Sequence, residues 1–454
     1  MTPNRSRARR RQAGFTLIEM TVSLIVIVEV LLAVLMLFDF SNKLSHAQSN
    51  IADMQQNLRI AQNEMNATVR MAGRGGLTFF NTALGGAIWM RDNVPVNTNI
   101  GDATSPLVVT GTDVLTVRGA FAAPMYQVNY LDSTALVYYL DDAWTTVTTD
   151  PNAARTGKLT INAQTAPDGQ TLQTLADIAN LASPHPLIHE AMILESANNS
   201  DVHAVVELVP ESSTVTATQV VLAFRVRGTP AQLVTSYTAL IPGGVFPSTM
   251  KSVSEVGILE EYRFYIRQNP ANATDMASKL TKARFMPGTD IAWGPPGNAA
   301  NSANLQIDLA DDILDLQVAL ALDTTNHVAR ATLPAGVSDN CTLTTIAADP
   351  ANCYISEAAN GVNDDWLYNS TTDNITNAVW SSAQLYYVRL SLLARTDGRD
   401  YKYEAPVLTN IEDHAYPATD PLNLGNDPLT APLSTKQRMF RRRILQTVID
   451  LRNQ

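Results

Sequence analysis

The sequence predicts an α+β protein in which one long N-terminal helix precedes a mainly antiparallel β-sheet domain. Glu29 is the only charged residue in the predominantly apolar segment 20–38, and a run of about twenty such residues is long enough to span a membrane as a helix. Beyond this run, apolar residues recur every three or four positions, which is typical of an amphipathic helix. The rest of the chain holds short β-branched and aromatic runs between Gly, Pro, Asn and Asp, with few strongly helical patterns, and this favours antiparallel pairing.

The first fourteen residues form a basic leader without an acidic residue. Its five arginines are Arg5, Arg7, Arg9, Arg10 and Arg11. Positive charge beside an apolar helix holds that end of the chain on the cytoplasmic side of a membrane. A secretory signal peptide has its small-residue cleavage site after the apolar segment, whereas Gly14 precedes it here. A cut after Gly14 would therefore leave the apolar helix on the mature chain.

The junction Gly14-Phe15-Thr16-Leu17-Ile18-Glu19 resembles the class III signal of type IV prepilins and type II secretion pseudopilins. The resemblance implies cleavage between Gly14 and Phe15 by prepilin peptidase, and N-methylation of Phe15. It also implies that Glu19 is the family's acid at the fifth mature position, which meets the N-terminal amine of a neighbouring subunit. The implied partners are other major and minor pilins, contacted through the helix, and the pilus assembly platform at the bacterial inner membrane.

Three acids, Glu19, Glu29 and Asp39, are spaced by ten residues. Ten residues of helix rise about 15 Å, so these acids mark the two faces and the midplane of a core about 30 Å thick. A carboxylate at Glu19 also suits the first turn of its own helix, so a local role stands beside the one implied by the resemblance. A charge at the midplane costs on the order of 3 kcal/mol. Glu29 is therefore either in contact with a partner pilin or a tolerated, protonated glutamate.

The predicted helix has a membrane part, about 15–40, and an amphipathic part, about 41–72, within an N-terminal segment of 15–76. Gly73, Gly75 and Gly76 are typical of a helix end. The amphipathic stripe could pack on the protein's own sheet or serve as a coiled-coil seam. The stripe consists of Leu44, Ala47, Ile51, Met54, Leu58, Ala61, Met65, Thr68 and Ala72.

Residues 77–454 are expected to form a β-rich periplasmic domain with insertions, in one unit or two. A short helix is predicted at 174–181, and the segments 82–104, 268–305 and 410–435 have loop composition. The predicted strands are 113–118, 135–140, 204–209, 219–225, 261–267, 313–322, 384–395 and 440–451.

The two cysteines, Cys341 and Cys353, are separated by eleven residues that include the turn-forming Asp349-Pro350. In an oxidising periplasm this spacing predicts a disulfide worth about 3 kcal/mol. A metal site with two thiol ligands is the alternative, but no histidine is near enough in sequence to complete a zinc set.

Several motifs follow one another in an order that resembles PilW-like minor pilins. They are MAGRGG at 71–76, DVLTVRG at 113–119, LDLQVALALD at 314–323, VRLSLLAR at 388–395 and the terminal RRRILQTVIDLRNQ. This resemblance implies a structural subunit of a type IV pilus. The large size of the domain favours a role in assembly or priming at or near the tip, because a bulky head would strain repeated packing along a shaft. A J-type minor pseudopilin of type II secretion is the related alternative. An adhesin or DNA-binding module exposed at the tip is a third hypothesis.

Residue patterns for catalysis or cofactor binding are absent, and we expect no enzyme, cofactor or metal site. His185 and His189 have a spacing suited to metal ligation on a helix, but Pro184 and Pro186 disfavour a helix there. Asp311, Asp312 and Asp315 lack the spacing of an EF-hand loop. The chain has no GxSxG, no Walker loop and no dinucleotide fingerprint.

Nucleic acid is not an expected partner, because the formal net charge is −11 and loss of the leader would remove five further positive charges. Binding to nucleic acid irrespective of its sequence depends on cationic groups that neutralise phosphates. One basic cluster leads into the last predicted strand, and we interpret it as a solvated strand edge. The cluster consists of Lys436, Arg438, Arg441, Arg442 and Arg443.

Overall fold

A computed structural model describes the chain in segments. The described residues are 16–75, 77, 86–95, 108–122, 125–128, 130–132, 137–138, 156–162, 172–179, 181–182, 190–196, 203–225, 253–268, 278–285, 287, 306–323, 366–368, 384–400, 403–424 and 437–451. The chain divides into two compact units, Met1–Asp53 and Met54–Gln454, and each unit is described by itself.

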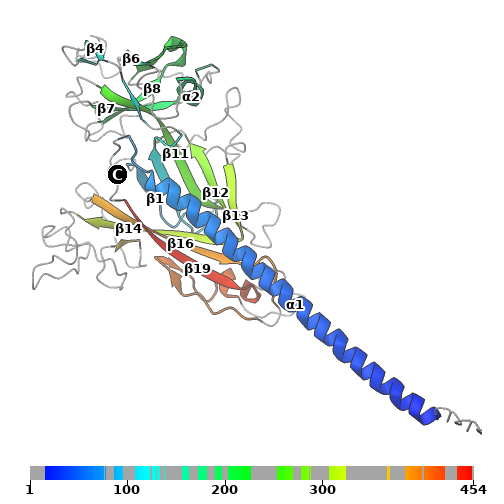
Figure 1. Cartoon of the computed structure of the whole chain (residues 1–454). Helices are drawn as coiled ribbons and strands as arrows, with labels where there is room; N and C mark the ends of the chain where they lie inside the picture. The colour runs from blue at the N-terminus through cyan, green and yellow to red at the C-terminus, as the bar shows by residue number, and fades with distance from the viewer. Residues whose placement is uncertain are drawn as a thin grey trace, which may run out of the picture. The chain divides into compact units, whose positions relative to one another are not determined.

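Helix α1, drawn in blue in Figure 1, runs from Leu17 to Arg70. In the first unit its apolar side chains are exposed, from Leu17 at 84% to Phe40 at 60%. In the second unit one face of the helix is buried. Its buried residues include five of the predicted stripe, Met54, Leu58, Ala61, Met65 and Thr68, and also Val69, which the stripe did not contain. A turn at residues 71–75 follows the helix, and Gly73 and Gly75 have φ angles of 78° and 106° there. Glycine adopts such angles without steric cost, which explains the predicted helix end.

The larger sheet has eleven strands, with the main order β1-β2-β11-β7-β8-β10-β6. Strands β12, β13, β3 and β9 pair beside this path. The bounds are β1 Ile88–Arg91, β2 Val114–Gly119, β3 Tyr126–Gln127, β6 Thr156–Asn162, β7 Ala191–Ser196, β8 His203–Leu208, β9 Thr214–Val215, β10 Gln219–Arg225, β11 Val253–Gln268, β12 Ser278–Phe285 and β13 Gln306–Asp311. All of these strand pairs are antiparallel.

Strand β11 holds the larger sheet together, because its two halves have different partners. Val253–Leu259 pair with β7, while Glu260–Phe264 pair with β2 and Glu261–Gln268 with β12. Figure 1 shows β11 as a long strand that extends from β7 to β12. The first half of β11, Val253–Leu259, therefore belongs to the same layer as β7, β8, β10 and β6. The short helix α2, Leu172–Ile178, lies near this layer.

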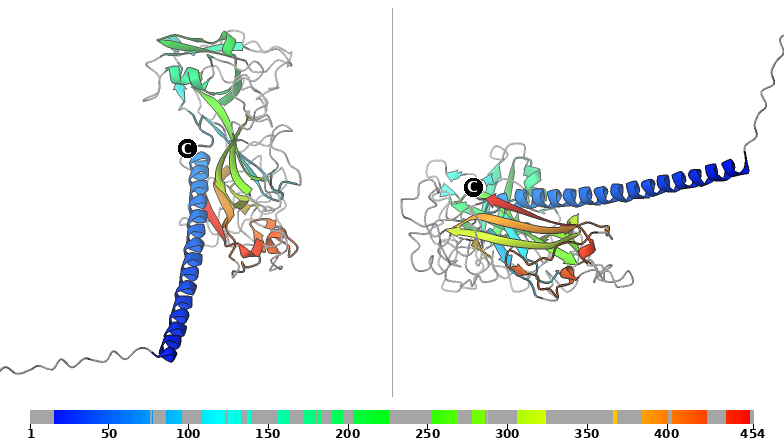
Figure 2. Two further views of the ribbon diagram at one scale, coloured as in Figure 1. Left: turned by 90° about the vertical axis from the view of Figure 1, so that its right-hand side faces the viewer. Right: turned by 90° about the horizontal axis from the view of Figure 1, so that it is seen from below.

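The smaller sheet has four antiparallel strands in the order β15-β14-β16-β19. Their bounds are β14 Ile313–Asp323, β15 Trp366–Leu367, β16 Gln384–Arg395 and β19 Arg442–Asp450. Figure 2 shows β14, β16 and β19 side by side. Between β16 and β19 the chain forms a small hairpin, β17 Asn410–Ile411 with β18 His414–Ala415. Three short 3-10 helices, Pro210–Ser212, Pro421–Asn423 and Gln437–Met439, and the two-stranded pair β4 Tyr130–Asp132 with β5 Val137–Tyr138 complete the described elements.

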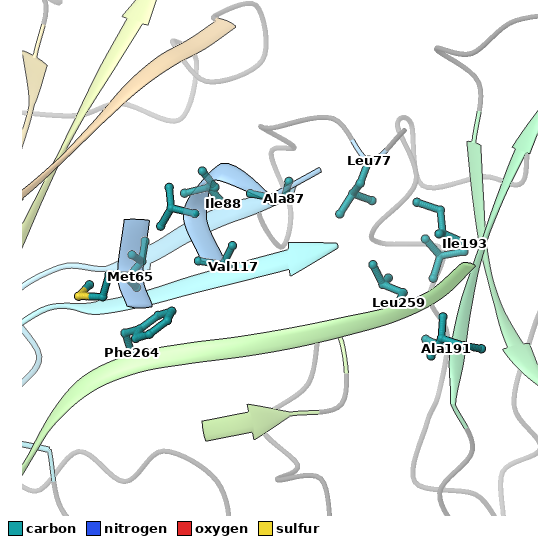
Figure 3. Close-up of a cluster of buried hydrophobic side chains, with 14 of the residues drawn as sticks. Met65, Leu77, Ala87, Ile88, Val117, Ala191, Ile193, Leu259 and Phe264 are labelled. Carbon is teal, nitrogen blue, oxygen red and sulfur yellow. The ribbon is translucent and has the colours of Figure 1, made fainter. Parts of the chain in front are cut away.

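One hydrophobic core joins the buried half of α1 to both sheets. Figure 3 shows Met65 of α1 near Val117 of β2 and Phe264 of β11. Polar contacts fix the same helix to three strands: Gln62 donates to Thr447 of β19, Lys282 of β12 pairs with Glu64 at 2.7 Å, and Asn57 donates to the carbonyl of Asp311 at 3.3 Å. The amphipathic stripe therefore packs on the protein's own sheets from Met54 onward, in agreement with the first of the two interpretations.

The predicted fold class, a long N-terminal helix followed by a mainly antiparallel sheet domain, is confirmed. All eight predicted strands overlap strands of the structure, although 135–140 overlaps only the two-residue β5. The loop interpretation of 82–104, 268–305 and 410–435 is wrong in part, because these segments contain β1, β12 and the β17–β18 hairpin. Strand β12 is rich in Lys and Arg, and its charges are paired within the fold, as Lys282 is with Glu64.

Candidate assembly site

The N-terminus of α1 is capped by side chains of its own first turn. The Glu19 carboxylate accepts hydrogen bonds from the backbone N–H of Thr16 at 2.9 Å and from the Thr16 hydroxyl at 3.0 Å. The backbone N–H of Glu19 in turn donates to Thr16 Oγ1 at 3.3 Å. This reciprocal arrangement is a capping box, which satisfies N–H groups that have no partner within the helix. The local role of Glu19 is therefore present in the single chain, while its role between subunits stays a prediction.

The two later acids of the helix differ in their surroundings. Asp39 pairs with Lys43 one turn further on, at 2.5 Å. Glu29 is exposed, and the described part of the chain offers it no hydrogen-bond or ion-pair partner. Among the described helices, α1 alone is long and apolar enough to cross a membrane, with a mean hydropathy of 2.8 over its most apolar 18-residue window. The helix is thus compatible with a single-pass membrane anchor in which Glu29 stands amid apolar residues.

The processing residues Gly14 and Phe15 lie outside the described residues, as do Cys341 and Cys353. Cleavage, methylation and the disulfide therefore stay predictions. His185 and His189 are also outside the described residues, whereas the adjacent Glu190 is buried and pairs with Arg284 at 3.1 Å.

Asp311, Asp312 and Asp315, the three aspartates compared with an EF-hand calcium loop, have separate partners. Asp311 pairs with Lys279 at 2.9 Å, and Asp312 pairs with Arg395 at 3.1 Å. Asp315 is buried and accepts from Gln317 at 2.9 Å and from the hydroxyl of Tyr416. The structure therefore does not bring these three carboxylates together as one group.

The basic cluster is at the beginning of β19, which ends the order of the four-stranded sheet. Arg438 pairs with Glu404 at 2.7 Å, and Arg441 pairs with Asp400 at 2.8 Å. Arg442 donates to the carbonyl of Leu422. Burial, with a contribution from neighbouring arginines, lowers the pKa of Arg442 to about 10. Arg443 is exposed, and Lys436 lies outside the described residues. The other three members of the cluster therefore make contacts within the chain at a strand edge.

The hairpin β17–β18 is fixed to the outer face of the four-stranded sheet by buried polar contacts. Arg389 of β16 donates twice to the Glu412 carboxylate, at 3.0 and 2.6 Å. Ser391 and Gln446 donate to the same carboxylate at 2.6 and 2.7 Å. Arg389 and Glu412 have side chains only 4% exposed. The hairpin is therefore an integral part of this sheet.

Asp113 joins the two sheets. Its N–H donates to the carbonyl of Leu316 at 2.9 Å, and its carboxylate accepts from the N–H of Val318 at 2.7 Å. Asp92, Asp113 and Asp413 each place a carboxylate oxygen within 4.8 Å of the others. Burial raises the pKa of Asp113 well above its ordinary value. Sequence reasoning missed this group, because its members come from three distant segments and have no shared motif.

A basic leader, an apolar helix that begins with a capping glutamate, and an antiparallel sheet domain together are the features that the resemblance to pilins leads one to expect. Residues 263–453 match the model of the PilW family, described as type IV pilus-assembly protein W. The chain is PilW-like over this segment, which covers less than half of it. The segment contains the four-stranded sheet, the hairpin and strands β12 and β13.

Comparison with solved structures gives a similarity to a type IV-like pilin from Thermus thermophilus, with 10% sequence identity. It covers 62% of this chain and 93% of that chain, with a TM-score of 0.16. A TM-score of this size supports no argument about the fold. No curated protein sequence matches the chain.

Proposed function

We propose that the chain is a minor pilin that assembles or primes a type IV pilus and stays at or near the filament tip. In this proposal prepilin peptidase cleaves the leader, 1–14, between Gly14 and Phe15, and Phe15 is N-methylated. The first part of α1 then holds the protein in the bacterial inner membrane, with the β-rich domain, 77–454, in the periplasm. The chain acts by packing against other pilins and carries out no catalytic step.

The match of residues 263–453 to the PilW family supports this proposal best. A second support is the exposure of the apolar part of α1, since a helix with apolar side chains on all sides needs either lipid or other helices around it. The described part of the first unit places Glu19 at the start of this helix and Glu29 ten residues further on. Both acids are on the exposed apolar part of α1, where we propose that neighbouring helices pack.

Glu19 and Glu29 have different roles in the proposal. The Glu19 carboxylate is held by Thr16 in the single chain, and the methylated amine of a neighbouring subunit would be a stronger partner because it carries a full charge. Glu29 would pair with a polar group on a particular partner pilin, because an ionisable residue inside a membrane normally faces a protein neighbour. Glu29 would then select the neighbour, whereas Glu19 would permit assembly itself.

The proposal is tested by mass spectrometry of the mature N-terminus together with pilus counts. We expect the wild-type chain to begin at a methylated Phe15, and a Gly14→Ala strain to keep the leader and to make fewer pili. A wild-type chain that begins before Phe15 would contradict the proposal. Measuring type II secretion in the same strains separates the pseudopilin alternative, since a pilus subunit should leave secretion unchanged.

The role of Glu29 has its own test. Glu29→Leu should reduce co-purification of other minor pilins while leaving N-terminal processing unchanged. Leu31→Ala, two residues along the same helix, is the matched control and should keep the partners. Unchanged co-purification in Glu29→Leu would remove the partner role from the proposal.

A further inference from the structure

The last strand, β19, forms one edge of the four-stranded sheet. In the part of the chain that the structure describes, it pairs with β16 alone. Its register with β16 runs without a shift from Arg442 to Asp450. In an antiparallel pair every second residue directs its N–H and C=O away from the partner strand. The outer edge of β19, the side that faces away from β16, therefore presents a regular row of backbone donors and acceptors.

The other edge strands of the two main sheets are shorter. Among the described residues they range from two residues in β15 to seven in β6. Strand β13 carries two acids, and its pairing with β12 has a register shift. Short length, charges and bulges protect edge strands from pairing with another chain. Strand β19 lacks these protections, because it has nine residues and its charges are confined to its two ends.

The two faces of β19 differ in exposure. The inner face packs on α1, where Gln62 donates to Thr447. On the opposite face Ile444 and Val448 are 47% and 51% exposed. They are four residues apart, so they lie on the same side of the strand. A long edge strand with exposed apolar side chains is a template for another strand, which covers these side chains and pairs with the backbone.

Two arginines begin the strand. Arg443 is exposed. Arg442 is partly exposed and donates to the carbonyl of Leu422, but its Nε and Nη1 have no hydrogen-bond partner among the described residues. Asp420 attracts Arg442, although its carboxylate already accepts from the N–H of Leu422 at 2.8 Å. Unsatisfied guanidinium donors favour a further acceptor, and a carboxylate matches their geometry best.

The cations around Arg442 have acids of their own. Arg395 pairs with Asp312 at 3.1 Å, and Arg438 pairs with Glu404 at 2.7 Å. Both arginines repel Arg442. Within the described residues the group therefore has more cations than paired acids, and an acid from outside the chain would complete it.

We propose that the outer edge of β19 binds an extended segment of another protein, which adds an antiparallel strand and places a carboxylate against Arg442 and Arg443. Apolar side chains of that segment cover Ile444 and Val448. Because the added strand is antiparallel, its acid lies near its C-terminal end. The proposal goes beyond the proposed function, since it concerns the sheet domain and not the membrane helix or its processing.

A second copy of this chain is the other occupant to consider. Two copies paired through β19 would be related by a twofold axis perpendicular to the sheet. Helix α1 packs on the face of the sheet, so this axis would make the two helices run in opposite directions. Two such helices would not enter one membrane from the same side, a reason that rests on the proposed function. We therefore take a different protein as the occupant.

Fluorescence anisotropy of the full-length protein in detergent micelles tests the proposal, with a labelled peptide of the sequence RRILQTVID as the probe. This is the sequence of β19, and in an antiparallel pair it places its aspartate opposite Arg442 and its first isoleucine opposite Val448. Two further peptides carry N-methyl groups on alternate sets of amides. One set faces β19, so its methylation should weaken binding at least about tenfold, while methylation of the other set should not. Equal affinities of the two methylated peptides would overturn the proposal.

Charge reversal tests the place of the carboxylate. Arg442→Glu/Arg443→Glu should weaken binding of the probe at least about tenfold, because charge-assisted hydrogen bonds are lost and repulsion replaces them. A peptide that ends in lysine instead of aspartate should bind this variant more tightly than the probe does. If the two peptides keep the same order of affinity in wild type and variant, the arginines do not bind the carboxylate and the proposal is wrong.

Exposed isoleucines on two edge strands give a matched pair of variants. Ile444→Lys should abolish binding of the probe, because it places a cation on the face that the added strand covers. Ile307→Lys, at a side chain 60% exposed on β13, should bind the probe as wild type does. An equal loss in both variants would overturn the proposal. Light scattering without the peptide tests the second copy: we expect a monomer, and a dimer that Ile444→Lys abolishes would make the occupant another copy of this chain and contradict the proposal.

Discussion

The carboxylate of Asp113 accepts a 2.7 Å hydrogen bond from the backbone N–H of Val318, and through it the two sheets meet. The N–H of Asp113 donates to the carbonyl of Leu316 at 2.9 Å. One residue just before β2 thus satisfies a donor and an acceptor on β14, in the way that a neighbouring strand would. Asp113 is fully buried, so neither contact can be replaced by water.

Replacing Asp113 by alanine should destabilise the second unit strongly. The substitution removes the acceptor for two N–H groups, those of Val318 and Asn93. Each buried N–H group left unsatisfied costs about 1–3 kcal/mol, so the free energy of unfolding should fall by about 2–6 kcal/mol. Urea unfolding in detergent, followed by tryptophan fluorescence, measures this. Asp311→Ala, at an exposed aspartate, is the control, and an equal loss in both variants would contradict the role of Asp113.

The raised pKa of Asp113 makes the free energy of unfolding depend on pH. Burial raises the pKa of Asp113 well above 3.8 in the folded protein. The folded state therefore holds the proton of Asp113 more tightly than the unfolded state. The contribution of this proton to the free energy of unfolding is fully present only below about pH 3.8. We expect the free energy of unfolding to decrease as the pH rises from there through the folded-state pKa. Asp113→Asn should show a smaller slope of unfolding free energy against pH, and an unchanged slope would disprove the assignment.

Much of the fold follows from sequence periodicity, because burial imposes that periodicity directly. Met54, Leu58, Ala61 and Met65 recur at helical spacing because one face of α1 meets both sheets. Strand β16 is predicted with its observed bounds, since it is a central strand with apolar residues on one face. Strand β12 is not predicted from the sequence, because its apolar residues alternate with cations whose partners lie on other elements; Glu64, the partner of Lys282, is more than two hundred residues away.

Replacing Arg389 by methionine should lower the free energy of unfolding, because it leaves a buried charge unpaired. The substitution leaves the Glu412 carboxylate buried without its cation, although Ser391 and Gln446 still donate to it. Removing one partner of a buried ion pair costs about 3–5 kcal/mol. The double variant Arg389→Met/Glu412→Gln removes both charges and keeps an acceptor for Ser391 and Gln446, so it should recover part of the loss. Denaturant unfolding of both variants checks this, and a double variant less stable than Arg389→Met would contradict it.

The candidate site was predictable only where a local motif carries the chemistry. Thr16 and Glu19 are three residues apart, so their capping contact follows from helix geometry. The pair Asp92 and Asp413 is separated by more than three hundred residues, and no single-sequence pattern connects them. Their meeting is a consequence of how β1 and the β17–β18 hairpin are placed by the two sheets.

The two roles of Glu19 are separable, because glutamine can also complete a capping box. Glu19→Gln keeps a side-chain acceptor for the N–H of Thr16 but removes the negative charge. Thr16→Val does the reverse, since it removes the hydroxyl and leaves the charge. If Glu19 meets the amine of a neighbouring subunit, Glu19→Gln should lower incorporation into pili several-fold more than Thr16→Val, with Thr16→Ser as the control that keeps the hydroxyl. Immunoblots of sheared pili against total protein measure incorporation. Equal losses in Glu19→Gln and Thr16→Val, or a loss in Thr16→Val alone, would mean that helix capping and not the charge governs assembly.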